Sequence, residues 1–299
     1  MPTVSSLADA ATVLAEADRC GRTVSLAQDL DLAGFDAIVE YEPGDLTCVV
    51  ESGIRLSRLA ATLAVEGQRL ALDPPGDPTI GECIALNLSG PLRHRFGPPR
   101  DHVLGATLVL ADGTIVNAGG KVVKNVAGYD LARLMCGARG DLAFVGRVAL
   151  RLHPLPESQA TLTVESRNVA RVARLLLNSQ LQPSALDILH PGRVAVLFEG
   201  RRQAVEAQLQ AALALVGGDR GADEVWTEAR ERQGTASGRL RFAPGDLQRA
   251  LGRAAEAVVR PAAGIAYVPF AVPDGRSAGE LRLAASLKAE LDPRGTLTC

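Results

Sequence analysis

Hydrophobic positions near the N-terminus repeat with the period of an α-helix. Leu7, Ala10, Ala11 and Leu14 follow helical spacing, so residues 1–21 predict an amphipathic helix that ends at Gly21. Short apolar runs then alternate with turn residues up to Pro156. This pattern predicts, in order, strands at 23–26, 37–41 and 47–51, a helix at 56–66, a helical stretch at 84–87, a hairpin of 103–110 with 114–117, a helix at 131–136 and a strand at 144–152.

Beyond Pro156 the pattern changes to short strands alternating with amphipathic helices. The predicted strands lie at 160–165, 185–189, 193–199, 239–242 and 265–270, and the predicted helices at 169–178, 202–216, 244–258 and 277–291. Such alternation is typical of helices layered on an antiparallel sheet, the α+β class with a ferredoxin-like arrangement. With 299 residues, the chain has room for two domains, and we predict them at 1–156 and 157–299.

Composition narrows the function classes. Apolar residues make up 47% and charged residues 22%, which indicates an ordinary globular protein rather than a disordered or fibrous one. A net charge of −2 gives no basic footprint for nucleic acid, and 3% aromatics leave few stacking platforms for single strands. We expect no nucleic-acid partner.

The cysteines and the apolar runs suggest where the protein works. Five cysteines (20, 48, 83, 136 and 299) are widely spaced and form no CxxC pair, so we expect reduced, buried thiols and a cytoplasmic protein. Neither a signal peptide nor an apolar run of membrane-spanning length is present in the sequence, and we expect no direct membrane insertion.

Several common site motifs are missing. The sequence contains no GxGxxG after a strand, no GxxxxGK[ST], no GxSxG and no HExxH. The four histidines are isolated from one another, so we expect no metal site.

Two Gly-rich segments, 73–101 and 119–140, are too long for plain connectors. Gly, Asn and Ser in such segments leave backbone N–H groups free, and free N–H groups in turns form concave anion sites. A helix that starts near Gly81 would add its dipole to a phosphate site, and Gly81 would allow close approach because it has no Cβ. The alternative is that both segments are ordinary surface loops.

The chain resembles the FAD-binding domains of the vanillyl-alcohol oxidase (PCMH) type over roughly residues 5–156. Within that family it is similar to the small flavin subunits, or E subunits, of bacterial glycolate oxidases. The most specific run is Lys124-Asn125-Val126-Ala127-Gly128-Tyr129-Asp130. The other runs that carry the resemblance are Tyr41-Glu42-Pro43-Gly44-Asp45-Leu46, Thr79-Ile80-Gly81, Ser89-Gly90-Pro91 and Arg100-Asp101.

The resemblance implies a two-subdomain FAD-binding fold followed by a cap domain, with non-covalent FAD held without a Rossmann fold. It places the pyrophosphate along the amides of 79–81, the 87–90 stretch near the phosphates or the flavin edge, and the 124–130 and 140–145 segments along the cofactor. The implied FAD-binding residues are Pro75, Thr79, Ile80, Gly81, Asn87, Ser89, Gly90, Lys124, Asn125, Gly128, Tyr129, Asp130, Gly140, Leu142 and Val145.

The sequence departs from the family pattern in two places. The Gly-rich phosphate loop after the first strand is missing, and Asp29 and Asp31 stand in its region. Glu82 replaces the second glycine of the usual Thr-x-Gly-Gly run. Negative charges repel a phosphate, so a flavin-free scaffold subunit stays open as an alternative.

Oxidation of a 2-hydroxy acid needs a carboxylate clamp and a base beside the flavin. Arg93, Arg95 and Arg100 are candidates for the clamp, and His94 or His102 for the base; solvated loop cations are the competing interpretation. The resemblance implies a larger flavin subunit and an iron–sulfur subunit as partners, and a small 2-hydroxy acid as substrate. A stand-alone flavin oxidase for another alcohol is a further alternative.

Overall fold

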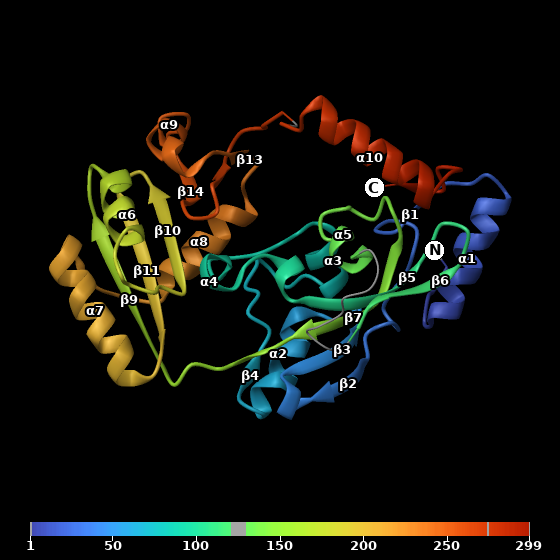
Figure 1. Cartoon of the computed structure of the whole chain (residues 1–299), viewed down its shortest axis with the longest axis horizontal. Helices are drawn as coiled ribbons and strands as arrows, with labels where there is room; N and C mark the ends of the chain where they lie inside the picture. The colour runs from blue at the N-terminus through green and yellow to red at the C-terminus, as the bar shows by residue number, and fades with distance from the viewer. Residues whose placement is uncertain (1, 121–129, 274, 299) are drawn as a thin grey trace.

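The structure is a computed structural model, and it describes residues 2–120, 130–273 and 275–298. Within these ranges the strands form a five-stranded and a seven-stranded antiparallel sheet and two small two-stranded sheets. The two large sheets lie side by side along the long axis of the molecule (Figure 1). We call residues 2–156 the five-stranded unit and residues 158–272 the seven-stranded unit. The α+β class predicted from the sequence is confirmed.

The five-stranded sheet has the order β2-β3-β7-β5-β6. Its strands are β2 (Ile38–Glu42), β3 (Thr47–Glu51), β5 (Val103–Val109), β6 (Ile115–Gly119) and β7 (Phe144–Arg151). Around it lie α1 (Leu7–Arg19), α2 (Leu56–Val65), α3 (Ile80–Ala85), α4 (Arg93–Phe96) and α5 (Leu131–Leu134). The short strands β4 (Gln68–Arg69) and β8 (His153–Pro154) pair with each other.

Local chemistry explains these elements. Helix α1 begins where the Ser6 side chain accepts a hydrogen bond from Asp9 N, and it buries Ala10, Leu14 and Ala17, as its periodicity predicts. The β5–β6 hairpin closes where Asp112 Oδ1 accepts from Thr114 N and Gly113 takes a φ of +85°.

The seven-stranded sheet has the order β12-β9-β11-β10-β14-β15-β13. Its strands are β9 (Ser158–Glu165), β10 (Ala185–His190), β11 (Arg193–Gly200), β12 (Asp219–Gly221), β13 (Gly238–Arg241), β14 (Ala257–Arg260) and β15 (Ile265–Val268). The helices α6 (Val169–Leu177), α7 (Arg202–Val216) and α9 (Leu247–Leu251) cover one face. The other face packs against α8 (Glu224–Gly234) and against Leu92 and Phe96 of the five-stranded unit. That second core joins the two units.

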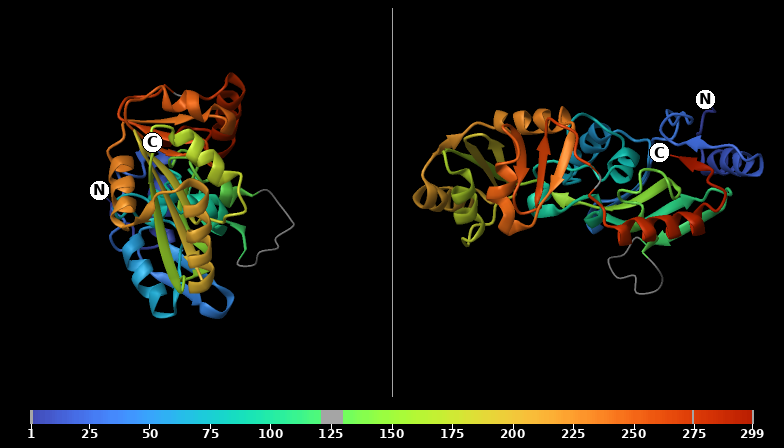
Figure 2. Two further views of the ribbon diagram at one scale, coloured as in Figure 1. Left: turned by 90° about the vertical axis from the view of Figure 1, so that its left-hand side faces the viewer. Right: turned by 90° about the horizontal axis from the view of Figure 1, so that it is seen from above.

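The C-terminal segment returns to the five-stranded unit. Helix α10 (Ala278–Leu291) runs back along it, and β16 (Leu297–Thr298) pairs in parallel with β1 (Val24–Ser25) (Figure 2). Lys288 Nζ donates to Asp141 O at 2.6 Å and to Leu297 O at 2.7 Å, which fixes the segment there.

Three local predictions are wrong. The helical stretch expected at 84–87 is α3, which begins at Ile80 because Thr79 and Glu82 form a capping box. The helix expected at 244–258 ends at Leu251, and 257–260 form β14 instead, since a short apolar run suits either state. The sequence pattern missed α8, whose buried face is Val225, Trp226, Ala229 and Gln233.

Candidate functional site

The amides of residues 79–81 are the predicted pyrophosphate site, and these three N–H groups and that of Glu82 all donate within the protein. Thr79 N donates to Glu82 Oε2 at 2.6 Å, and Glu82 N to Thr79 Oγ1 at 3.1 Å. Ile80 N donates to Ile54 O at 2.9 Å and Gly81 N to Ser52 O at 2.7 Å. The N-terminus of α3 therefore faces the turn after β3, and no N–H of this group is left for a phosphate.

The small size of Gly81 has a structural use. A Cβ at position 81 would lie 3.1 Å from both the Cβ and the carbonyl oxygen of Ser52. The missing Cβ of Gly81 therefore serves close packing against Ser52 within the chain itself. Asp29 and Asp31 are also used locally, because Asp29 Oδ2 accepts from Ser25 N at 2.8 Å and Asp31 Oδ1 from Ala33 N at 3.0 Å.

The C-terminal end of α3, unlike its N-terminus, has a buried polar atom without a hydrogen-bond partner among the described residues. Asn87 has a φ of +53°, and its Oδ1 is buried without a hydrogen-bond partner among the described residues. Gly137 N donates to Ile84 O and Arg139 N to Ala85 O, both at 2.9 Å, so 137–139 run alongside this end. Residues 137–139, which directly precede the predicted 140–145 segment, thus lie beside the end of α3 that leads to Asn87, and we call residues 84–87 with 137–142 the α3 rim.

Within and beside the α3 rim, the predicted residues differ in exposure. Leu142 is buried in the five-stranded core, and Val145 packs against the same core. Gly140 has a φ of +86° and faces Leu26. Asp130 caps α5 by accepting from Arg133 N at 3.1 Å. The predicted residues Lys124, Asn125, Gly128 and Tyr129 lie outside the described residues.

The turn at Ser89–Gly90 meets the seven-stranded unit. Ser89 O accepts from Gln233 Nε2 at 2.9 Å and from Arg260 Nη1 at 3.2 Å. On its other side the backbone of the turn packs directly against that of Asp73, because a Cβ built on Gly90 would lie 1.7 Å from Asp73 O. Pro75 likewise packs near Gly234 of α8. This predicted flavin contact is therefore part of the junction between the units.

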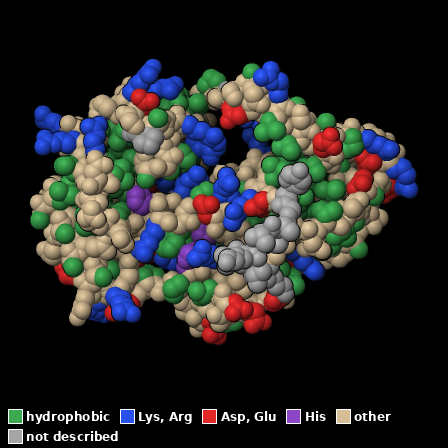
Figure 3. Space-filling model, viewed as in Figure 1, with side chains coloured by type: hydrophobic (Ala, Val, Ile, Leu, Met, Phe, Trp, Pro, Cys, Tyr) green, Lys and Arg blue, Asp and Glu red, His purple; other side chains and the backbone are tan. Residues whose placement is uncertain are grey.

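Arginine side chains gather at the same junction. Arg93 Nη1 donates to Ser89 Oγ at 3.1 Å, and among the described residues neither Arg93 nor Arg239 has a carboxylate at ion-pair distance. Burial lowers the pKa of Arg93, and the positive charges of Arg239 and Arg260 act in the same direction, whereas Tyr267 and Asp101 act in the opposite one. In the space-filling view, Lys and Arg side chains surround the hollow in the middle of this face (Figure 3).

Sequence reasoning missed Arg239 and Arg260. Arg239 lies opposite Tyr267 in the β13–β15 pair, and the Arg260 guanidinium lies 5.0 Å from the centre of the Tyr267 ring. No sequence signal marked Arg260, because arginine is rarely buried unless it is paired, and its partner Asp187 lies far away in the chain.

The other predicted clamp residues lie apart from Arg93. Arg95 Nη1 donates to Ser184 Oγ at 3.5 Å and lies over the Phe96 ring. Arg100 is exposed, and its charge acts on the Cys136 thiol beside α5. The structure therefore divides the three predicted arginines between the junction and the α3 rim.

The two candidate bases also differ. Burial lowers the pKa of His94, so its imidazole is neutral near pH 7 and can accept a proton. His102 is fully buried, and burial together with the nearby His153 lowers its pKa to about 4. Its ring packs edge-on against His153 at 5.7 Å, which makes it a core residue.

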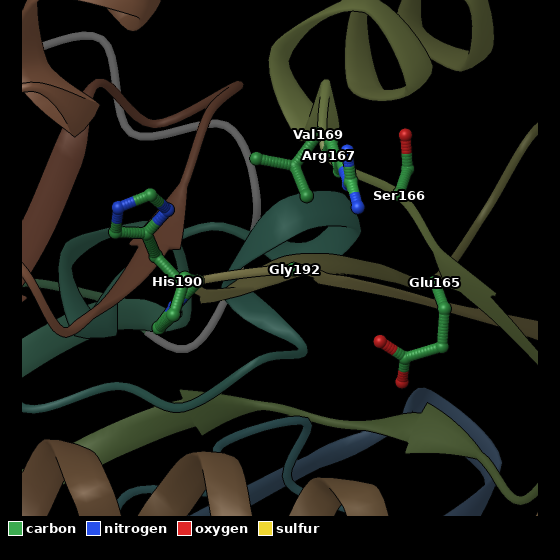
Figure 4. Close-up of a pocket in the computed structure, with 7 residues that line it drawn as sticks. Glu165, Ser166, Arg167, Val169, His190 and Gly192 are labelled. Atoms are coloured by element: carbon green, nitrogen blue, oxygen red, sulfur yellow. The ribbon is translucent and has the colours of Figure 1, made fainter.

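Two cavities lie away from the predicted FAD-binding residues. The larger, of about 560 Å³, is lined by Glu165, Ser166, Arg167, Val169, His190, Pro191 and Gly192; His190 and Glu165 stand on opposite sides of it (Figure 4). The other, of about 390 Å³, lies where the two units join, with Arg69, Arg95, Phe96, His153 and Arg201 in its wall. Neither contains a predicted FAD-binding residue.

Other site types find no support in the described part of the chain. It holds no group of three or more His, Cys, Asp or Glu side chains arranged for a metal. None of its helices has the length and apolar character needed to cross a membrane. Cys48 and Cys83 are buried, whereas Cys20 is exposed, contrary to the expectation that the thiols are buried.

FAD needs donors for its phosphates and polar partners for its ring. The N-terminus of α3 does not fit the phosphates, because its amides are already used. The α3 rim fits the ring edge, because the unpartnered Asn87 Oδ1 can accept from a ring N–H. Arg139 belongs to this rim, and Arg100 and Arg133 lie near the neighbouring Cys136, where Asp130 and Asp101 oppose their charge.

Comparisons with known proteins agree with a flavin site. The sequence model of a family described as "FAD binding domain" matches residues 20–119. The chain is 34% identical to glycolate oxidase subunit GlcE of Escherichia coli K12 over 218 residues, which cover 71% of the chain and 61% of GlcE. It is 34% identical to glycolate oxidase subunit GlcD of Bacillus subtilis 168 over 172 residues, 54% of the chain and 36% of GlcD.

Two further matches extend the picture. A mitochondrial D-lactate dehydrogenase (cytochrome) of Saccharomyces cerevisiae is 30% identical over 175 residues, 57% of the chain and 29% of the enzyme. The chain thus spans less than two thirds of these curated relatives. The solved structure of an alkyldihydroxyacetonephosphate synthase matches 98% of the chain and 74% of its own length with a TM-score of 0.73 at 13% identity, which shows a shared fold.

Proposed function

The chain carries an FAD-binding domain of the PCMH type, and on that premise we propose that it is the small flavin subunit of a glycolate oxidase-like complex that oxidises a 2-hydroxy acid. The names of the relatives support this choice, because two are glycolate oxidase subunits and one is a D-lactate dehydrogenase. Its partners are then a larger flavin subunit and an iron–sulfur subunit, and the complex is cytoplasmic.

The observation that carries the substrate class is the arginine pair at the junction. Arg93 is half-buried in α4, and Arg239 lies on strand β13 of the seven-stranded unit, from where its charge acts on Arg93. Neither arginine has a carboxylate at ion-pair distance among the described residues. Burial partly desolvates the Arg93 guanidinium, and such a group without a carboxylate at ion-pair distance favours an anion; its planar fork matches a carboxylate. We assign the substrate carboxylate to this pair.

Two further parts of the proposal concern where FAD binds and how the chain divides into domains. We propose that the flavin ring lies along the α3 rim beside Asn87 and that the domains are 1–156 and 157–299, with α10 crossing back onto the first. Bound flavin supplies a two-electron acceptor for the hydride of the substrate. His94 follows Arg93 in α4, and we propose its neutral imidazole as the group that takes the hydroxyl proton.

The test starts with the purified chain. We expect it to contain FAD, identified by absorbance and by mass after heat release, and we expect glycolate or D-lactate to bleach the flavin anaerobically once the partner subunits are present. Arg93→Met removes a charge-assisted hydrogen bond to the substrate, so KM should rise roughly tenfold to a hundredfold with FAD content unchanged. Arg253→Met is the matched control, because Arg253 is exposed and has no ion pair among the described residues.

One observation favours a second candidate, a flavin-free scaffold subunit. The amides of 79–82 are all used within the chain, and Glu82 places its carboxylate at the end of α3 where a phosphate would sit. A protein that stays colourless after incubation with FAD, and that still assembles with the larger subunits, would support the scaffold and exclude the flavin subunit.

A further inference from the structure

Arg260 is buried at the junction between the two units, far from solvent. Its side chain is 2% exposed, and Asp187 beside it is 0% exposed. The Arg260 Nε lies 3.4 Å from Asp187 Oδ1, and Nη2 donates to Gln233 Oε1 at 2.7 Å. A buried guanidinium costs several kcal/mol of desolvation unless its donors are paired, so the positions of these groups are strongly constrained.

Arg260 and Gln233 each direct a further N–H donor at one atom of the five-stranded unit. Arg260 Nη1 and Gln233 Nε2 both donate to the carbonyl oxygen of Ser89, at 3.2 and 2.9 Å. Arg260, Gln233 and Ser89 O therefore form a closed triangle of hydrogen bonds. We call Arg260 and Gln233 the Ser89 clamp. The two side chains come from β14 and α8, and Ser89 lies 144 residues or more before them in the chain.

The clamp acts on the residue that we assign to the substrate. The side chain of Ser89 accepts from Arg93 Nη1 at 3.1 Å, so the position of Ser89 sets the direction of Arg93. On the opposite side, Asp73 accepts from Leu92 N at 3.1 Å, and Gly90 fits against the Asp73 backbone. The turn is thus held from both sides, by the seven-stranded unit and by Asp73.

We propose that Arg260 and Gln233 are positioning residues, which fix the Ser89–Gly90 turn from the seven-stranded unit and so shape the anion site at Arg93. The inference rests on the proposed function only for what the site binds. The positioning itself is a property of the chain without any ligand. Because side chains of the seven-stranded unit hold the carbonyl oxygen of Ser89 in the other unit, the geometry of the anion site at Arg93 depends on how the two units pack together.

Two variants separate positioning from general stability. Arg260→Lys keeps a positive charge for Asp187 but cannot reach Gln233 and Ser89 O together. Gln233→Glu keeps the acceptor for Arg260 but loses the donor to Ser89 O. Arg193→Lys is the matched control, because Arg193 pairs with Glu228 in the same unit and makes no contact with the turn.

The first readout is hydrogen exchange in the protein without ligand. Leu92 N donates to Asp73, Arg93 N to Gly90 O and His94 N to Pro91 O, so these amides report whether the turn is held. We expect exchange at 92–94 to rise tenfold or more in both variants and to stay within twofold of the wild type in the control. Unchanged exchange in both variants overturns the positioning, whether or not the protein binds FAD.

The second readout is the function of the assembled complex. In both variants KM for glycolate should rise about tenfold, while the flavin spectrum and kcat stay near those of the wild type. Faster exchange with an unchanged KM would show that the turn does not shape the substrate site. A wild-type chain that takes up no FAD would instead remove the proposed function, and the exchange data would still decide the role of the clamp.

Discussion

Gly90→Ala should be among the most destabilising small substitutions in this chain. A Cβ at position 90 would lie 1.7 Å from the carbonyl oxygen of Asp73 and 2.5 Å from its carbonyl carbon. Both atoms belong to the backbone, so no side-chain rotation can relieve the overlap, and the turn at 89–92 must move as a whole.

The size of the effect follows from what that movement breaks. Overpacking of a well-packed site costs about 1–3 kcal/mol, and this contact is at or beyond the upper end because the overlap is with the main chain. Movement of the turn would also weaken the two hydrogen bonds to Ser89 O. We expect a loss of about 3 kcal/mol or more, which for a chain of this size lowers Tm by roughly 6–12 °C.

The assay is thermal unfolding followed by circular dichroism, with Gly44→Ala as the control. Nothing lies within 4 Å of a Cβ built on Gly44, so this variant should unfold within about 2 °C of the wild type. If Gly90→Ala were as stable as Gly44→Ala, Asp73 would not pack against the turn. The turn would then be held only by Arg260 and Gln233, from one side.

Three further predictions follow from contacts elsewhere in the structure. In the folded protein the pKa of His102 is about 4, below its ordinary value of about 6.5, so its contribution to the free energy of unfolding is present above pH 6.5 and is lost as pH falls toward 4. Urea unfolding at pH 5 should therefore show about 2 kcal/mol less stability than at pH 7.5. His102→Phe should remove this part of the pH dependence of stability. Thr79→Ala removes the cap of α3 and should cost about 1 kcal/mol in the same assay, whereas an unchanged stability would contradict the capping box. Asp292→Ala removes the acceptor for the amides of Thr296 and Leu297, so trypsin should release the C-terminal residues faster than in the wild type; equal rates would count against the docking of β16.

The sequence by itself determined most of the local structure. The apolar period predicted α1, and Asp-Gly predicted the β5–β6 turn, because helical period and turn chemistry depend on neighbours in the chain. The motifs also indicated the FAD-binding domain, which the family match confirms. The same reasoning failed at 257–260, where the position of β14 between β10 and β15 makes a strand of residues that local pattern assigned to a helix.

The site depended on contacts that no local pattern contains. The sequence marked 79–81 as a phosphate cradle, but the partners that use up the amides of Ile80 and Gly81 lie 26 and 29 residues earlier, at Ile54 and Ser52. Arg260 meets Ser89 across 171 residues, and the charge of Arg239, on β13 of the other unit, acts on Arg93. Hydrogen bonds and charges act through space, so only the tertiary structure decided which polar groups are already paired and which remain available to a ligand.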